Sequence, residues 1–235
     1  MGREHDVLIN ADFSRRAAVS AQDFRWVSSP QAGVERVMLD RVGGEVARAT
    51  SFVRYAAGSH FPRHVHGGGE EILVLEGTFS ADAQHYPAGW YLRSPPGSSH
   101  QPFSEEGAML FVKLCQMPPD ERREVRIDTR SPASWVRRDG RQLCPLHESS
   151  HEKVWIERLQ PGQPLDCSPV HGMEMLVLDG ALRVDDECFA RPSWIRVPAG
   201  EQPRVAGDAS GATLYVKTGH LGVDMVSASL ARSPT

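Results

Sequence analysis

The sequence lacks several features that would define a protein class at once. Its four cysteines, Cys115, Cys144, Cys167 and Cys188, form no C-x-x-C pair, which excludes a disulfide framework and a zinc-finger pattern. No apolar run approaches the roughly 18 residues that a membrane-spanning helix needs. Residues 1–6 lack the apolar core of a signal peptide. We therefore expect a soluble, cytoplasmic protein with no membrane partner.

An excess of positive charge is also missing. The 26 lysines and arginines are outnumbered by 30 aspartates and glutamates, so the net charge is −4. A chain without a basic field attracts phosphate backbones poorly, and we expect no nucleic-acid partner. Hydrophobic residues make up 40% of the 235 residues, which is too many for a disordered chain and suits a globular fold.

Glycine and proline, in contrast, are abundant. The chain has 21 Gly and 17 Pro, together about 16% of its residues against a usual level of roughly 12%. Segments rich in β-branched and aromatic residues, such as 50–55 and 109–114, lie between turn clusters. No window shows a sustained helical period. Many short strands at regular spacing predict an all-β sandwich or barrel.

An internal repeat divides the chain. The string EEILVLEG at 70–77 returns as MEMLVLDG at 173–180, which is 103 residues later. Three further landmarks recur in the same order at offsets of 103 or 104 residues. Because order and spacing agree, we interpret the chain as a duplication of two similar domains, residues 1–120 and 121–235.

A cluster of metal-binding residue types lies in the first domain. His64 and His66 are two residues apart, so both side chains face the same side of a strand. Glu70 opens the next apolar strand after a glycine turn, and His100 follows a Pro-x-Gly turn. A chain of this composition contains an H-x-H pair about 0.4 times by chance, so the pair alone does not indicate a metal site. The prediction of a metal site depends on the glycines, the glutamate and the third histidine around it. Three imidazoles and a carboxylate from three strands suit one divalent transition metal with one or two open coordination positions.

The same residues carry a resemblance to a known family. The run 68–77, followed by 86–89 and 93–100, resembles the cupin of ChrR-type anti-sigma proteins over about residues 24–116. Through the repeat, the resemblance extends weakly to the remainder. It implies a bicupin, an all-β protein of two tandem cupin barrels (double-stranded β-helix or jelly-roll). It also implies that the four residues named above ligate one metal, zinc in the ChrR relatives and iron in related single-domain cupins that cleave acetylacetone-like diketones.

Two departures from the family limit what carries over. ChrR-type proteins bind a sigma factor through an N-terminal helical segment that also binds zinc. The residues before the metal motif here contain no Cys and do not resemble that segment. We therefore expect no sigma-factor partner. The diketone-cleaving relatives bind iron through three His, whereas Glu70 is present here. Because three His and one Glu can bind Zn, Fe, Mn or Ni, the sequence does not determine which metal is bound.

The second domain lacks most of these ligands. Pro203 stands where the repeat places the counterpart of His100. We expect a degenerate, metal-free barrel with a structural role or a homodimer surface. The alternative is a partial site made of Cys167, His171 and Glu174, although an incomplete ligand set holds a metal weakly.

Side chains near the metal site are expected to line a substrate pocket. Ile72 and Val74 share the face of the carboxylate ligand by strand alternation, and Phe61 precedes the histidines. Tyr91 and Arg93 share one face of a later strand, and either face of it could point inward. If the face that carries Tyr91 and Arg93 points inward, Arg93 could hold an anionic or enolate substrate. The alternative is a solvated arginine on the outer face.

Two functions fit the sequence. The first is a metal-dependent enzyme acting on a small oxygenated substrate, such as a β-diketone or hydroxyketone, and with iron a dioxygenase that cleaves it. The second is a ChrR-like zinc-binding sensor or regulatory module that binds an effector without catalysis. The sequence names no catalytic residue, and it leaves open whether the protein is an enzyme, because a fold does not name its chemistry.

Overall fold

The chain folds almost entirely into β-strands, as the sequence predicts. The computed structural model describes residues 7–44, 47–166 and 170–222, and within them the helical segments are two single 3-10 turns, η1 (Ala21–Asp23) and η2 (Pro132–Ser134). Turns therefore make most of the connections, which accounts for the abundance of glycine and proline. Within the described ranges there is no helix long and apolar enough to cross a membrane.

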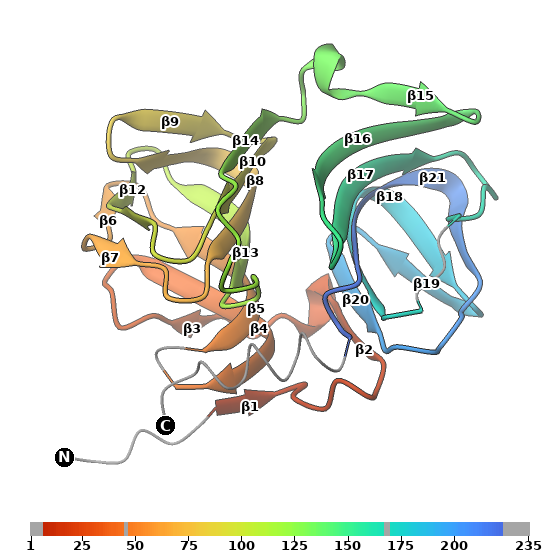
Figure 1. Cartoon of the computed structure of the whole chain (residues 1–235), viewed down its shortest axis with the longest axis horizontal. Coiled ribbons are helices and arrows are strands. Elements are labelled where there is room, and N and C mark those ends of the chain that lie inside the picture. The colour runs from red at the N-terminus through yellow and green to blue at the C-terminus, as the bar shows by residue number, and fades with distance from the viewer. Residues whose placement is uncertain (1–6, 45–46, 167–169, 223–235) are drawn as a thin grey trace. The chain divides into compact units, whose positions relative to one another are not determined.

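The structure divides into two compact units (Figure 1). Unit 1 comprises residues 7–11 and 25–130, and unit 2 comprises residues 12–24 and 131–222. The division after residue 120 expected from the sequence therefore falls inside unit 1. Residues 12–24 belong to unit 2, although they precede most of unit 1 in the chain.

The strands are mostly short. In unit 1 they are β1 (Val7–Ile9), β3 (Val27–Ser28), β4 (Val34–Gly43), β5 (Arg48–Tyr55), β6 (Ser59–His60), β7 (His64–Val65), β8 (Glu70–Ala81), β9 (Gln84–Pro87), β10 (Trp90–Ser94), β11 (Ser99–His100), β12 (Pro102–Ser104), β13 (Ala108–Leu114) and β14 (Val125–Asp128). In unit 2 they are β2 (Ala17–Ser20), β15 (Val136–Arg138), β16 (Arg141–Glu148), β17 (Lys153–Leu159), β18 (Met173–Val184), β19 (Glu187–Ala190), β20 (Ser193–Val197) and β21 (Val205–Thr218). The two segments predicted as strands, 50–55 and 109–114, lie in β5 and β13.

Two edge strands explain where the units divide. β14 pairs antiparallel with β10, with Ile127 opposite Tyr91, and so extends the sheet of unit 1 beyond residue 120. β2 pairs antiparallel with β20, with Ala18 opposite Ile195, and so adds an edge to unit 2. The second pairing joins segments about 175 residues apart, and no repeat landmark marks it.

Unit 1 is built around one long strand that belongs to two sheets. One sheet has the strand order β1-β4-β5-β13-β8-β10-β14. β8 pairs with β10 and β13 from Glu70 onward, and with β9 and β12 over Thr78–Ala81. Because the partners change along β8, the two sheets share this strand and enclose an apolar interior, as in a jelly roll.

Unit 2 repeats this plan with the order β15-β16-β17-β21-β18-β20-β2. The landmark glycines of the repeat occupy the same position in both units. Gly77 in β8 has a φ of +65°, and Gly180 in β18 has a φ of +70°. A Cβ atom at Gly77 would overlap the carbonyl oxygen of Gly107, and one at Gly180 would overlap that of Gly211. Glycine is required at both places, so the repeated motif reflects one backbone geometry used twice.

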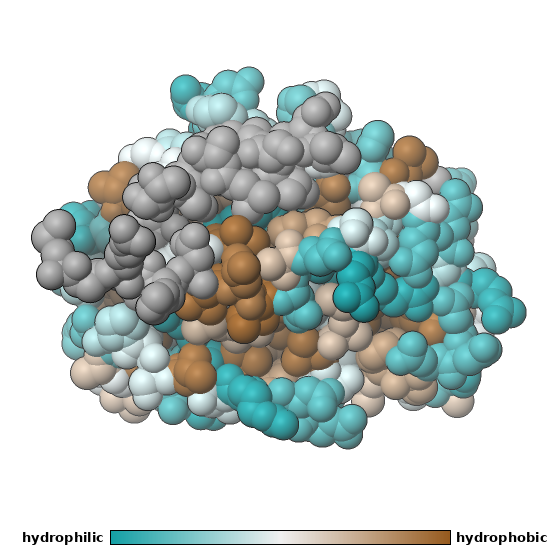
Figure 2. All heavy atoms as spheres, turned by 90° about the horizontal axis from the view of Figure 1, so that it is seen from below, coloured by the Kyte–Doolittle hydropathy of each residue, from teal (hydrophilic) through white to brown (hydrophobic). Residues whose placement is uncertain are grey.

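The interior of each unit is packed with apolar side chains. Alternate residues of β8 and β13, such as Ile72, Val74 and Leu110, face the interior of unit 1. Met175 and Val177 of β18 do the same in unit 2. Some apolar side chains stay at the surface, and Figure 2 shows them as brown spheres among teal polar side chains. Burial of the others supplies most of the stabilisation of each unit.

Candidate metal centre

The predicted ligands come from strands and turns that the backbone ties together. β7 pairs antiparallel with β11, which sets His100 opposite His64. The N–H of His66 donates to the carbonyl of Ser98, and the carbonyl of His66 accepts from the N–H of Gly97, both at 2.9 Å. The turn before β11 therefore holds both histidine-bearing segments in one register.

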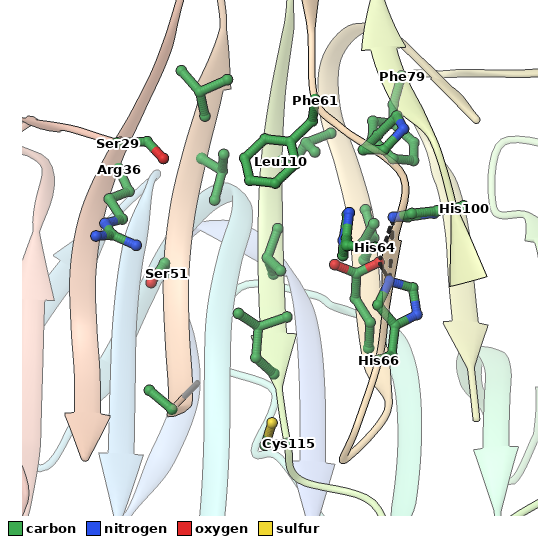
Figure 3. A pocket seen from close by; sticks show the side chains of 18 of the residues that line it. Ser29, Arg36, Ser51, Phe61, His64, His66, Phe79, His100, Leu110 and Cys115 are labelled. Atoms are coloured by element: carbon green, nitrogen blue, oxygen red, sulfur yellow. Dashed lines mark hydrogen bonds and ion pairs between the residues drawn. The ribbon is translucent and has the colours of Figure 1, made fainter. Parts of the chain in front are cut away.

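The four predicted side chains converge, and Figure 3 shows the three histidines among them close together. One ligand atom from each of His64, His66, Glu70 and His100 lies within 4.8 Å of the others. His66 Nε2 is 3.2 Å from His100 Nε2, and Glu70 Oε2 is 3.3 and 3.4 Å from these two nitrogens. Two atoms bonded to one metal at about 2.1 Å are roughly 3.0 Å apart at a right angle and roughly 3.4 Å apart at the tetrahedral angle. The spacings among His66, Glu70 and His100 match this range.

Hydrogen bonds on the far side of two imidazoles set their tautomers. His64 Nδ1 lies 3.0 Å from the carbonyl oxygen of Pro62, which can only accept, so Nδ1 is the donor. His66 Nδ1 lies 3.0 Å from Ser98 Oγ, whose own proton is donated to the carbonyl of Pro95 at 2.5 Å. The hydroxyl oxygen therefore accepts from His66. In both rings the Nε2 lone pair is left available for a metal.

Burial sets the protonation state of the site. Burial lowers the pKa of His66 to about 4 and that of His100 to about 3, and the neighbouring imidazoles and Arg126 add to the effect. Burial raises the pKa of Glu70 to about 8 against the attraction of Arg126. At pH 7 these two imidazoles are neutral and the carboxyl is protonated, so their contacts are not ion pairs. Neutral imidazole is the form that binds a metal, and a metal would displace the proton of Glu70.

Glu70 also carries an unsatisfied oxygen. Its Oε2 atom is buried and has no hydrogen-bond partner within the described structure, although two imidazole nitrogens lie just over 3 Å away. Buried polar atoms without a partner are rare in native proteins. A cation at the centre of the cluster would satisfy this oxygen. The donor set of three imidazoles and one carboxylate fits Zn, Fe, Mn or Ni.

A cavity of about 350 Å³ opens beside the cluster (Figure 3). Phe61 and Ile72 line it, as the sequence predicts, and Leu110 adds to its apolar wall. Val74 packs in the same apolar interior but is not part of the cavity wall. His64 is only partly buried, whereas the other three ligands are buried. All four side chains of the cluster line the cavity, so a small molecule bound in it would contact them.

Tyr91 and Arg93 lie outside this cavity, which corrects their expected place in the pocket. β10 pairs with β8 in a register that turns Leu92 inward, and Arg93, opposite Glu71, lies on the other face. The Arg93 side chain is fully buried, with Nη1 3.0 Å from Glu71 Oε2. The guanidinium is neither a substrate ligand nor a solvated arginine, because it neutralises a buried carboxylate.

Several residues near the cluster were not found by sequence reasoning. Arg126 donates to the carbonyl of Arg93 at 2.9 Å and to Ser94 Oγ at 3.1 Å, and its charge reaches the buried ligands. Tyr55 lines the cavity, as does Arg36 from β4. Strand alternation puts Tyr55 on one face with Val53 and Arg36 on one face with Val34, but it does not say which face points inward. No sequence signal indicates Arg126, because β14 joins the sheet through a non-local pairing.

Unit 2 has an apolar side chain in place of the carboxylate ligand. Met173 is the first residue of β18, as Glu70 is of β8, and it is buried in the apolar interior. Within the residues that the structure describes, the metal-type cluster is the one in unit 1. That the second barrel is degenerate and metal-free stays a prediction.

Glu174 does not support the alternative partial site in unit 2. It lies on the other face of β18, where its carboxylate accepts from Trp194 Nε1 at 2.6 Å and lies 2.9 Å from His220 Nε2. His171 is exposed. Cys167, the third residue of that alternative, lies outside the described residues.

Comparison with known proteins agrees with this geometry. Residues 14–118, a little under half of the chain, match the family model of the ChrR cupin-like domain. The pirin YhhW from Escherichia coli, solved in complex with nickel(II), has a TM-score of 0.62 at 14% identity over 86% of this chain and 98% of its own. A cupin 2 conserved barrel domain protein from Leptotrichia buccalis has a TM-score of 0.56 at 12% identity, with 82% and 91% covered.

A further solved structure comes from Nostoc punctiforme. It is described as a candidate dioxygenase and has a TM-score of 0.64 at 15% identity, covering 95% of this chain and 86% of its own. No protein of curated function matches this chain in sequence. At such identities the solved structures share the fold alone. Residues 14–118 are therefore similar to a cupin-like domain, the chain shares the fold of these solved structures, and its His/Glu cluster could bind a metal.

Proposed function

We propose that this protein is a metal-dependent cupin enzyme that acts on a small oxygenated substrate. The observation that carries the proposal is the convergence of three histidines and one glutamate beside an apolar cavity. His64, His66, Glu70 and His100 would hold one divalent transition metal, with iron or zinc preferred over manganese or nickel. Such an ion, when bound, supplies Lewis acidity toward a carbonyl or hydroxyl oxygen, and iron adds chemistry with dioxygen.

The residues of the chain prepare this site before any metal arrives. The hydrogen bonds from His64 to Pro62 and from His66 to Ser98 orient both rings with Nε2 free. Orientation of this kind by neighbouring groups raises metal affinity. The apolar wall at Phe61 and the interior around it keep water from much of the cavity, which strengthens polar interactions with a bound substrate.

Tyr55 offers a proton donor in the same cavity. Burial first, and the charge of Glu70 second, raise the pKa of the Tyr55 phenol, so the hydroxyl stays protonated at neutral pH. A protonated phenol can donate a hydrogen bond to the oxygen of an enolate. A β-diketone or hydroxyketone forms an enolate when it loses a proton, so substrates of this class fit the residues present.

A zinc-binding sensor is the second candidate function. It is favoured by the match of residues 14–118 to the ChrR cupin-like domain. In that case the same four side chains would hold zinc, and the cavity would take an effector that is not turned over.

Metal content and oxygen uptake test the enzyme. Elemental analysis of untagged protein, purified without added metal, should find one transition metal per chain. Iron-loaded protein should consume dioxygen with members of a panel of β-diketones and hydroxyketones, and a His100→Ala variant should not. One zinc per chain without turnover on the panel would favour the sensor. No metal after reloading would overturn both candidates.

A further inference from the structure

The cavity of unit 1 has two chemically different sides. Figure 3 shows the imidazoles on one side and the guanidinium of Arg36 on the other, together with Ser29 and Ser51. Phe61 and Leu110 lie between them. One side of the cavity therefore holds the metal-type cluster, the other side holds the cationic guanidinium of Arg36, and apolar side chains lie between them.

Arg36 enters the cavity because of strand alternation in β4. Its chain neighbour Glu35 points the other way and pairs with Arg54 on β5, with Glu35 Oε2 2.6 Å from Arg54 Nη2. The Arg36 Nε atom is buried and has no hydrogen-bond partner within the described structure. No carboxylate of a described residue lies within ion-pair distance of its guanidinium.

The guanidinium of Arg36 has a buried Nε–H donor without a partner, which costs free energy unless a ligand supplies an acceptor. Its fork of donors matches a carboxylate, and such charge-assisted hydrogen bonds are among the stronger ones in proteins. The nearest carboxylate in the same cavity is that of Glu70, which belongs to the metal-type cluster on the opposite side. The anion that fits Arg36 is therefore one that a ligand brings.

The sheet register sets the length of that ligand. Arg36 is opposite Val53, Val53 is opposite Leu110, and Leu110 is opposite Val74 of β8. Three steps of about 4.8 Å put β4 roughly 14 Å from β8 along the sheet. Glu70 lies four residues before Val74 on β8, which adds roughly 13 Å along the strand. The long side chains of Arg36 and Glu70 both reach into the cavity from these positions, and the ligand spans the gap that they leave between the guanidinium and the cluster.

We propose that Arg36 binds the carboxylate of the substrate, which makes the substrate class a small oxygenated organic acid. The metal-facing end would carry the carbonyl or hydroxyl oxygens, and a short carbon chain would lie against Val53, Leu110 and Val112. The cavity of about 350 Å³ is at the lower end of the roughly 300–1,000 Å³ of small-molecule sites, which suits a ligand of this size. This inference rests on the proposed metal site and names the substrate class for it.

Two seven-carbon ligands test the inference. 4,6-Dioxoheptanoate and heptane-2,4-dione carry the same β-diketone, and they differ in that the first ends in a carboxylate where the second ends in a methyl group. Calorimetry on the zinc-loaded protein, which does not turn them over by redox chemistry, should show at least about tenfold tighter binding of the acid. Arg36→Met should remove this preference, and Arg36→Lys should keep part of it.

Arg54→Met is the matched control, because Arg54 lies on the neighbouring strand with its side chain outside the cavity. It should keep the wild-type preference. Equal binding of both ligands by the wild type, or an unchanged preference in Arg36→Met, would overturn the role of Arg36 and leave the metal site standing. Binding of neither ligand by protein that holds one zinc per chain would overturn the proposed function together with this inference.

Discussion

Removal of the Ser98 hydroxyl is expected to weaken metal binding without removing any ligand. Ser98 Oγ accepts from His66 Nδ1 at 3.0 Å while it donates to the carbonyl of Pro95 at 2.5 Å. In Ser98→Ala the imidazole loses the group that sets its tautomer and its orientation. Partners of metal-bound histidines typically contribute about 10- to 100-fold in affinity, or about 1.4–2.7 kcal/mol.

Competition for zinc against a chelator of known affinity measures this change. We expect the Kd of Ser98→Ala to rise about 10- to 100-fold, whereas Ser98→Thr, which keeps a hydroxyl, should stay closer to the wild type. Ser99→Ala is the matched control, because Ser99 is exposed on β11 beside the same turn. An unchanged Kd for Ser98→Ala would refute the assignment of His66 Nε2 as a ligand atom oriented from Nδ1.

Three other changes test the site and the fold. His100→Ala should remove the bound metal while unit 2 stays folded, and full metal occupancy in this variant would show that the ligand set is wrong. Zinc binding at pH 7 should release about one proton from Glu70, whose pKa is about 8, and almost none from His66 or His100, whose pKa values are about 4 and 3. Glu70 is protonated below its pKa and already ionised above it, so its proton release should fall toward zero by about pH 9.5. Calorimetry in buffers of different ionisation enthalpy measures this release. A proton release that does not change with pH would contradict the raised pKa of Glu70. Gly77→Ala should lower the free energy of unfolding by about 2 kcal/mol or more, since its Cβ would overlap the backbone at a positive φ, and an unchanged melting temperature would contradict this geometry.

Local patterns in the sequence were enough to predict the fold class and the candidate ligand set. The repeat of two β-rich halves follows from spacing along the chain, and Gly77 and Gly180 show why, because both positions exclude a Cβ atom. The pair His64 and His66 could be recognised because residues two apart in an extended segment point to the same side, although β7 itself ends at Val65. These signals depend on short-range geometry, which a single sequence carries.

Tertiary structure decided which face of each strand points inward. Alternation shows that Arg93 shares a face with Tyr91, but only the pairing of β10 with β8 puts that face outside the cavity and against Glu71. The same kind of pairing turns Arg36 inward. A shift of one residue in register would exchange the two faces, and the register is set by strands distant in sequence.

Non-local contacts also decided the surroundings of the candidate metal centre and the division of the chain. Ser98 meets His66 across a gap of 32 residues, and its role depends on a hydroxyl that donates to Pro95 at the same time. β2 joins unit 2 by pairing with β20 far along the chain. Such pairings form between segments whose sequences need only be compatible with a strand edge, so they leave no motif. The sequence therefore determined what the site is made of, and the folded sheets decided what surrounds it.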